Sequence, residues 1–281
     1  MIIVADGGST KVDWALIEDG KLWKRVFTHG ANPFFRTGED ISEELLHKLV
    51  PEVEGHRVES VHFFGAGCVG GAKNEIIRDA IHVSLQAGKV EVGSDMLGAA
   101  KGLLGDRKGI ACILGTGSNS GYYDGKEITE NVSPLGFILG DEGSGAVLGR
   151  LFVGACLKNQ FGKELKVEFL EQTGFQSGDF IEHVYRGKQP NRFLAGFAPF
   201  IKLHLSDERI YRMVETSFED FFRRNVMQYD YENTAICFTG SVAYHFQDVL
   251  RSVAHRLHLQ LAEIVASPME GMIAYYSRLN Q

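Results

Sequence analysis

The sequence is poor in residues that would crosslink the chain, and it is poor in positive charge. Its 281 residues include 4 cysteines, which stand far apart without a CxxC spacing. Neither a disulfide framework nor a zinc knuckle is therefore indicated. Lys and Arg number 29 against 36 Asp and Glu, and the formal net charge is −7. That balance argues against non-specific binding to nucleic acid.

Long apolar segments are missing as well. No apolar run is long enough to span a bilayer, and the sequence shows no signal-peptide pattern. We therefore expect a cytoplasmic protein whose partners include neither a membrane nor nucleic acid. Proline is scarce, with 6 residues, whereas glycine is abundant, with 33. Many of the glycines follow short apolar runs, which is typical of an α/β protein whose loops bind ligands.

Residues 2–17 predict a β-hairpin. The apolar run at 2–5 indicates a buried strand, and the DGG sequence at 6–8 is a strong turn signal. The returning strand alternates between apolar and polar residues, so that Val12, Trp14 and Leu16 share one face.

The turn of this hairpin carries groups that suit a phosphate. Its glycines let the backbone approach a ligand closely, and its hydroxyls and successive N–H groups can wrap phosphate oxygens. Its acid can hold a metal ion through water. The residues of the turn are Asp6, Gly7, Gly8, Ser9, Thr10 and Lys11. An ordinary hairpin with a polar tip would show the same pattern, because short glycine-rich motifs have many false positives.

The rest of the first half mixes strands and helices. Strands are expected at 21–28, 58–64 and 89–92, and helices at 41–49, 74–87 and 96–104. The resulting element order is βββαβαβα.

The second half restarts the same pattern. A buried strand at 109–114 ends in a glycine-hydroxyl turn, and strands at 119–123 and 126–132 follow. Beyond them we expect helices at about 146–157 and over most of 160–230, strands at 234–238 and 257–263, and a terminal helix at 268–279 capped by Ser267. The repeated strand–turn–strand–turn–strand unit indicates an internal duplication.

This duplication predicts two domains. Residues 1–106 would form the N-terminal domain and residues 107–267 the C-terminal domain with helical insertions, with a hinge near 105–108. The terminal segment 268–281 would pack back on the first domain. The aromatic residues within 193–231 have helical spacing and are interpreted as core. A contact surface of a homodimer is the alternative for them.

Four polar turns follow apolar strands, at residues 6–11, 94–95, 115–119 and 240–241. Ligands of α/β sheets bind at the carboxyl ends of strands. Two glycine-hydroxyl turns that face each other could hold a triphosphate from both sides. The pattern therefore favours a nucleotide as a ligand.

Five motifs occur in order over nearly the whole chain: DGGSTK (6–11), GTGSNS (115–120), GDEGSG (140–145), FLAGF (193–197) and TGSV (239–242). In this arrangement the chain resembles the sugar kinase/actin superfamily. Within it, the chain resembles the N-acetylglucosamine kinase-like proteins that are grouped with the BadF/BadG/BcrA/BcrD ATPases. The resemblance implies an α/β fold of two ribonuclease-H-like domains with an ATP cleft between them.

The resemblance also implies an activity and its ligands. We expect an ATP-dependent kinase that uses Mg²⁺ and phosphorylates an amino sugar such as N-acetylglucosamine, N-acetylmuramic acid or glucosamine. A homodimer is a further expectation from the family.

The roles of single residues follow from the same resemblance. Asp6 would lie near Mg²⁺, and Thr10 would contact phosphate oxygens with the rest of its turn, Gly7, Gly8, Ser9 and Lys11. The second phosphate loop would consist of Gly115, Thr116, Gly117 and Ser118. The remaining nucleotide contacts would be Ala195, Gly240 and Ser241.

The acceptor side of the predicted site has its own residues. Asn32, Asn119, Gly136 and Asp141 match the sugar-binding positions, and Asp95 matches the catalytic base. The chemistry needs such a carboxylate, because a sugar hydroxyl has a pKa far above 7 and must lose its proton as the phosphoryl group is transferred.

Each assignment has a plainer alternative. Asp95 could be only the N-cap of helix 96–104, and Asp141 only the first-turn acid of a helix at 143–157. Asn32 could be a simple Asn-Pro turn residue, and Lys11 could form a surface ion pair. Glu142 is interpreted as structural.

Two positions depart from the family's pattern. Leu135 and Phe34 stand where the related sugar kinases have Trp. Both positions would lie near the sugar, so the sequence leaves open which amino sugar is the substrate.

Two further functions compete with the kinase. An ATPase that activates a radical dehydratase would hold an iron–sulfur cluster through thiolates, and Cys68 and Cys156 do not match that subgroup's cysteine motifs. A non-catalytic, sugar- or nucleotide-binding regulator would need a recognition module if it bound DNA, and the net charge of −7 does not favour that function.

Overall fold

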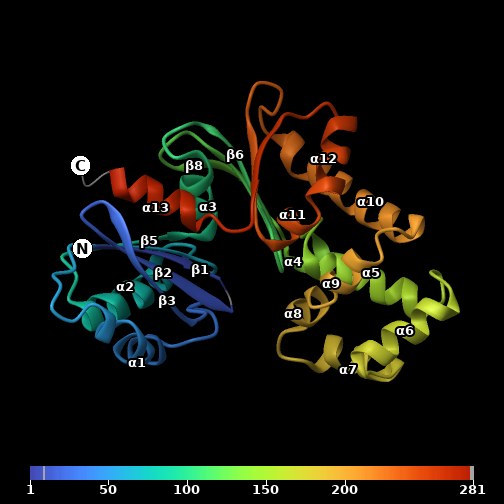
Figure 1. The fold of residues 1–281 in the computed structure, drawn as a ribbon, viewed down its shortest axis with the longest axis horizontal. Coiled ribbons are helices and arrows are strands. Elements are labelled where there is room, and N and C mark those ends of the chain that lie inside the picture. Colours follow the sequence, from blue (N-terminus) through green and yellow to red (C-terminus); the bar gives the residue numbers. More distant parts are fainter. Residues whose placement is uncertain (9, 279–281) are drawn as a thin grey trace. The chain divides into compact units, whose positions relative to one another are not determined.

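The computed structural model describes residues 1–8 and 10–278 (Figure 1). Ser9 and residues 279–281 lie outside the described part. The chain divides into two compact units. The first comprises Met1–Lys108, Tyr123–Ile128 and the segment from Ser267 onward, and the second comprises Gly109–Tyr122 and Thr129–Ala266.

The first unit is built on a five-stranded sheet of order β3-β2-β1-β4-β5. Strands β1 (Ile2–Gly7), β2 (Lys11–Glu18) and β3 (Lys21–His29) pair antiparallel. Strands β4 (Ser60–Gly65) and β5 (Lys89–Ser94) extend the sheet in parallel with β1. Its helices are α1 (Gly38–Lys48), α2 (Gly71–Leu85), α3 (Asp95–Leu104) and α13 (Met269–Arg278), with a 3₁₀ turn at Val50–Glu52.

Alternation along the strands decides which helices cover each face of this sheet. Trp14 packs in one cluster with Ile41 of α1 and Ile77 of α2. Its neighbour Ala15 packs on the other face in a cluster with Met272 of α13. Figure 1 shows α1 and α2 on one side of the sheet and α13 on the other. The prediction of one shared face is confirmed for Val12, Trp14 and Leu16.

The second unit repeats this topology. Its sheet has the order β10-β9-β6-β7-β8, which corresponds strand by strand to β5-β4-β1-β2-β3. The strands are β6 (Gly109–Leu114), β7 (Ser118–Tyr123), β8 (Ile128–Val132), β9 (Ile236–Thr239) and β10 (Leu261–Val265). The predicted duplication and the mixed α/β class are therefore confirmed.

Helices fill the long connection between β8 and β9 and the one between β9 and β10. They are α4 (Gly136–Leu139), α5 (Gly145–Leu157), α6 (Lys163–Thr173), α7 (Ser177–Arg186), α8 (Pro190–Ala195), α9 (Ala198–Leu203), α10 (Glu208–Arg224), a 3₁₀ turn at Val226–Gln228, α11 (Ser241–His245) and α12 (Gln247–Arg256).

The predicted aromatic region forms the core of this unit. Phe200, Phe218, Phe221 and Phe222 are buried in one large apolar cluster with β6, β9 and α5. The core interpretation of these phenylalanines is therefore confirmed.

Several predicted boundaries shift. The last strand was predicted at 257–263 but is β10, Leu261–Val265, because Leu257 still donates its N–H to Val253 and His258 turns with a positive φ of 58°. The stretch 193–205 forms two short helices that part at Gly196 and Phe197. The predicted end of the terminal helix, Leu279, lies outside the described residues.

The part of the chain that the structure describes includes no helix with the length and apolar character that a membrane crossing requires.

Candidate functional site

The parallel strands of the first unit end side by side. The strand register pairs Gly7 with Gly65, and Gly65 with Ser94. The turn after Asp6, the loop after Gly65 and Asp95 therefore emerge at one edge of the sheet. A side chain at Gly7 would lie 2.6 Å from the ring of Phe63, so the close approach of these strands requires glycine there.

Asp6 is half-buried among negative charges. Its strand partner is Asp13. Burial, together with the carboxylates of Asp13 and Asp95, raises the pKa of Asp6 to about 6, against the opposing effects of Lys11 and a hydrogen bond from the Ser267 hydroxyl. A divalent cation would relieve this accumulation of negative charge. The role of Asp6 beside Mg²⁺ stays a prediction.

Asp95 stands at the first position of α3. The N-cap of this helix is Ser94, whose hydroxyl accepts a hydrogen bond from the Leu97 N–H at 3.2 Å. The alternative that Asp95 is the cap is therefore wrong. One carboxylate oxygen of Asp95 accepts the Met96 N–H at 2.8 Å. Burial raises the pKa of Asp95, and hydrogen bonds from backbone N–H groups oppose the shift.

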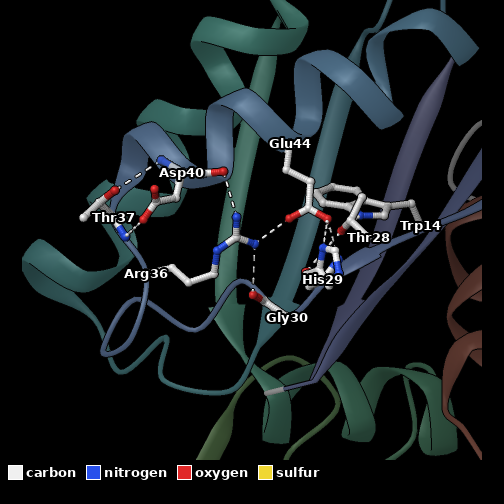
Figure 2. A network of polar contacts seen from close by, with 8 residues as sticks. All are labelled: Trp14, Thr28, His29, Gly30, Arg36, Thr37, Asp40 and Glu44. Atoms are coloured by element: carbon white, nitrogen blue, oxygen red, sulfur yellow. Dashed lines mark hydrogen bonds and ion pairs between the residues drawn. The ribbon is translucent and has the colours of Figure 1, made fainter.

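The loop that carries Asn32 is held by a polar network (Figure 2). Arg36 donates to the Gly30 carbonyl at 3.3 Å, to the Asp40 carbonyl at 2.7 Å and to the Glu44 carboxylate at 2.5 Å. Glu44 also accepts the His29 N–H at 2.6 Å. Both ends of the loop are thereby attached to α1, which positions Asn32 before any ligand binds.

Asn32 makes the turn that its sequence predicts, and it contacts the rest of the site. Its side-chain oxygen accepts the Phe34 N–H at 2.9 Å, so the amide NH₂ is the group left to donate to a ligand. The same side chain packs on Gly67, where any side chain would clash with it. The next residue, Cys68, lies near enough to Asp95 for that carboxylate to contribute, after burial, to raising the thiol's pKa to about 12. Asn32 and Asp95 thus lie near the same loop of the first unit, residues 67–68.

The second unit has an equivalent edge. The register aligns Ile113 of β6 with Thr239 of β9, and Thr239 with Val265 of β10. Gly240 follows with a φ of 112° and donates its N–H to the Val265 carbonyl at 3.1 Å. A side chain at Gly240 would clash with the carbonyl of Leu114. The structure therefore brings Gly240 against the strand end from which the second glycine loop begins.

The second glycine loop is fastened to the start of α5. Gly145 and Ala146 donate their N–H groups to the carbonyls of Gly115 and Thr116, at 2.8 and 3.1 Å. A Cβ at Gly145 would lie 3.1 Å from the Cβ of Ala195. Two separate predicted nucleotide positions, the loop and Ala195, therefore meet at the first turn of α5. Thr116 and Ser241 are exposed at this edge.

Asp141 lies against the same loop. Its carboxylate accepts the Ser118 N–H, and a Cβ on Gly117 would be 3.1 Å from one of its oxygens. Burial, with a smaller contribution from the negative charge of Glu142, raises the pKa of Asp141 to about 6. The helix begins only at Gly145 with Ser144 as its N-cap, and Asp141 has a φ of 53°. The alternative of a first-turn helix acid is therefore wrong.

Asn119 is oriented by its neighbours. Its side-chain oxygen accepts the Ser120 N–H at 2.9 Å and the side-chain amide of Asn131 at 2.9 Å. Its own NH₂ group is therefore the part that can donate to a ligand. Tyr229 supports this segment, because its hydroxyl donates to the Ser120 carbonyl at 3.0 Å and accepts the Val132 N–H at 2.8 Å.

Two predicted positions are less well defined. Gly136 is exposed at the start of the short helix α4, with a φ of 75°, and Leu135 beside it is 60% exposed. Ser9 lies outside the described residues, so the structure says nothing of its role.

Comparison with solved structures identifies the family. The chain superposes on the crystal structure of a candidate N-acetylglucosamine kinase from Porphyromonas gingivalis with a TM-score of 0.94 and 48% identity, over 99% of each chain. The chain belongs to the N-acetylglucosamine kinase-like sugar kinases. No family model matches the chain, so its grouping with the BadF-type ATPases stays a prediction.

Two other relatives extend this result. The N-acetylmuramic acid/N-acetylglucosamine kinase of Clostridium acetobutylicum is 29% identical over 227 residues, which cover 74% of each chain. A glucokinase from Streptomyces griseus, solved with glucose and AMPPNP, shares the fold with a TM-score of 0.61 at 19% identity, over 99% of this chain and 98% of that one. The fold of two α/β units is thus shared with the two solved structures.

The cysteines of this N-acetylglucosamine kinase-like chain do not suit a cluster. Cys68, Cys112, Cys156 and Cys237 are all buried. Burial raises the pKa of the Cys156 thiol to about 11, whereas cluster ligands must be thiolates. Among the described residues, no group of three or more His, Cys, Asp or Glu side chains is arranged to hold a metal ion.

The sequence did not indicate which residues support the predicted binding loops. Arg36, Glu44, Asn131 and Tyr229 orient the loops without carrying a motif of their own. Ser267 was predicted as a cap, and its hydroxyl does accept the Met269 N–H at 3.3 Å. Its hydrogen bond to Asp6 had no signal in the sequence, because the two residues are far apart in the chain.

Proposed function

We propose that this protein transfers the γ-phosphoryl group of ATP to a hydroxyl of an amino sugar of the N-acetylglucosamine type. The observation that carries the proposal is the 48% identity, over 99% of both chains, to a candidate N-acetylglucosamine kinase. The name of the Clostridium relative supports the same substrate class. The AMPPNP bound to the glucokinase of the same fold supports ATP as the donor.

In the proposed reaction Asp95 accepts the proton of the attacking hydroxyl. Its environment suits a base, since the helix cap is provided by Ser94 and one carboxylate oxygen is fixed by the Met96 N–H. A pKa raised by burial makes the carboxylate a stronger proton acceptor. Such general-base assistance contributes about 10²–10⁴-fold to a rate.

The amides and acids of the two units supply complementary hydrogen bonds. Asn32 and Asn119 have their carbonyl oxygens occupied by the protein, so both are proposed to donate to sugar oxygens. Asp141, held by the Ser118 N–H, is proposed to accept from a sugar hydroxyl. A sugar hydroxyl both donates and accepts hydrogen bonds, so it suits the amide donors and the carboxylate acceptor alike.

Phosphate binding is proposed for the two glycine loops. The N–H groups and hydroxyls of residues 7–11 and 115–118, with Lys11, would bind the triphosphate, and Gly240, Ser241 and Ala195 the nucleoside. Asp6 would hold Mg²⁺ through water, and when bound this ion neutralises charge on the phosphates.

The test is ADP release from Mg-ATP with a panel of sugars, comparing the wild type with Asp95→Asn. We expect release that depends on an amino sugar and falls about 10²–10⁴-fold in the variant, with ATP affinity within about twofold of the wild type. Asp79→Asn, an exposed carboxylate on α2, is the matched control and should keep full activity. Unchanged turnover in Asp95→Asn would contradict the base assignment, and ADP release that ignores every sugar would contradict the kinase.

A further inference from the structure

Lys73 stands beside the Asn32 loop, and no carboxylate of residues 1–8 or 10–278 forms an ion pair with it. Its Nζ donates to the Pro33 carbonyl at 2.9 Å and lies 4.5 Å from the centroid of the Phe34 ring. The lysines that form ion pairs within the described part of the chain are Lys24 and Lys101. Lys73 is half-buried and forms no ion pair with an acid among the described residues, so its ammonium group is available to an anion from outside.

Helix stability does not explain this lysine. Lys73 is in the first turn of α2, where a positive charge is unfavourable because the N-terminal end of a helix is itself positive. The first turn of α2 contains no acid, whereas that of α1 contains Glu39 and Asp40. The stability of α2 therefore gives no reason for a positive charge at this position.

One apolar ring lies beside the cation, and a second exposed apolar side chain stands nearby in the sequence of the same site. The ring of Phe34 is 58% exposed, and Val69 is 74% exposed. Phe34 is two residues from Asn32 along one loop, and Val69 is two residues from Gly67, on which Asn32 packs. The sugar-binding amide therefore has a cation and an exposed aromatic face beside it within one unit.

We propose that Lys73 and Phe34 form a subsite for an acidic substituent of the amino sugar, so that the preferred substrate is a 2-acetamido sugar carrying a carboxylate. The lactyl ether of N-acetylmuramic acid has this chemistry, with a carboxylate for Lys73 and a methyl group for the ring of Phe34. The proposal rests on the proposed function, because Asn32 must hold the sugar. A charge-assisted hydrogen bond to Lys73 would favour the acid over its neutral analogues.

The test compares N-acetylmuramic acid, its methyl ester and N-acetylglucosamine, by calorimetric binding without ATP and by phosphorylation. The wild type should bind the acid at least about tenfold more tightly than the ester. Lys73→Met should remove that preference and leave the ester and N-acetylglucosamine within about threefold of the wild type, and Lys73→Arg should restore it. Lys48→Met, an exposed lysine on α1, controls for the change in net charge.

Each outcome decides the proposal. Equal losses for all three sugars in Lys73→Met would show that the lysine only clamps the loop through Pro33, and a wild type that binds acid and ester alike would also overturn the subsite. Sugars that bind with the expected preference but are not phosphorylated would contradict the proposed function instead. Absence of binding by all three sugars would overturn both.

Discussion

At the residue scale, the proposed role of Asp141 as an acceptor for the sugar opposes its effect on stability. Its backbone is left-handed, its side chain is 8% exposed, and its carboxylate has one hydrogen bond from the Ser118 N–H. Burial raises its pKa to about 6, so the ionised form is held at a cost in folding free energy. A buried acid kept ionised at neutral pH is a strong acceptor for a ligand hydroxyl.

The raised pKa of Asp141 sets the sign with which this residue makes stability depend on pH. The folded state binds the proton of Asp141 more tightly than the unfolded state, so its contribution to stability is complete below about pH 4 and is lost as pH rises through about 6. Asp141→Asn carries no charge and tolerates the left-handed backbone. We expect the variant to be more stable than the wild type at pH 7.5, on the order of 1 kcal/mol, and to bind the sugar more weakly.

Urea unfolding at pH 5 and pH 7.5 measures the first effect, and sugar titration the second. The difference in the free energy of unfolding between variant and wild type should be smaller at pH 5 than at pH 7.5. A variant that is clearly less stable at pH 7.5 would show that the ionised carboxylate stabilises the fold, against the direction stated here.

At the scale of elements, helix α5 holds the second glycine loop in place. Its first N–H groups hold the carbonyls of Gly115 and Thr116, and it packs closely on α8 through small residues. A side chain at Gly149 would clash with the carbonyl of Leu194. The close helix contact therefore fixes where Ala195, the neighbour of Leu194, lies relative to the glycine loop.

Two glycines of this helix provide a matched pair. Gly149→Ala should destabilise the protein by about 1–3 kcal/mol, because overpacking forces backbone shifts, and it should weaken ATP binding by moving α8. Gly154→Ala changes the same residue type in the same helix where a Cβ meets nothing within 4 Å. It should raise stability by about 0.5–1 kcal/mol through helix propensity. Thermal unfolding with and without ATP distinguishes them, and equal effects of the two substitutions would argue against close packing of α5 on α8.

At the scale of the whole molecule, the chain leaves and rejoins its first unit. The final segment from Ser267 belongs to the unit that begins at Met1. Helix α13 buries Met269, Met272 and Tyr276 against the first sheet. The second unit has a separate core, which contains Phe218.

Because the two units have separate cores, a cavity in one core should destabilise mainly the unit that contains it. Met272→Ala should cost about 2–5 kcal/mol and speed hydrogen exchange in peptides of residues 1–108 and 267–278. Phe218→Ala should cost about 3–5 kcal/mol and speed exchange in the second unit. If either substitution loosened both units equally, the protein would unfold as a single cooperative body.

Local patterns predicted the elements well. Hydrophobic periodicity predicted the strands and most helices. In β2, for example, residues two apart share a face, so that Val12, Trp14 and Leu16 pack in one cluster. The errors of the prediction lie at the ends of helices and strands. Ser94 rather than Asp95 caps α3, and β10 starts late because the chain turns after α12 through His258, whose backbone is left-handed. Both boundaries depend on backbone angles that the types of the neighbouring residues do not determine.

The orientation of site residues could not be predicted in the same way. The motif at 115–120 identified Asn119, but which end of its amide faces a ligand depends on Asn131, twelve residues away. By sequence Asp141 could be a helix acid or a ligand acceptor, and its place before the N-cap Ser144, with a φ of 53°, excludes only the first.

The amino-acid sequence by itself determined the class of fold, the duplication and the order of the motifs, because these depend on hydrophobic period and turn chemistry over a few neighbouring residues. Only the tertiary structure decided which groups stand together: Asn32 on Gly67, Lys73 beside Phe34, and Ser267 on Asp6. The physical reason is that hydrogen bonds, burial and charge act through space. Their partners here come from segments that the fold, not the sequence order, brings together.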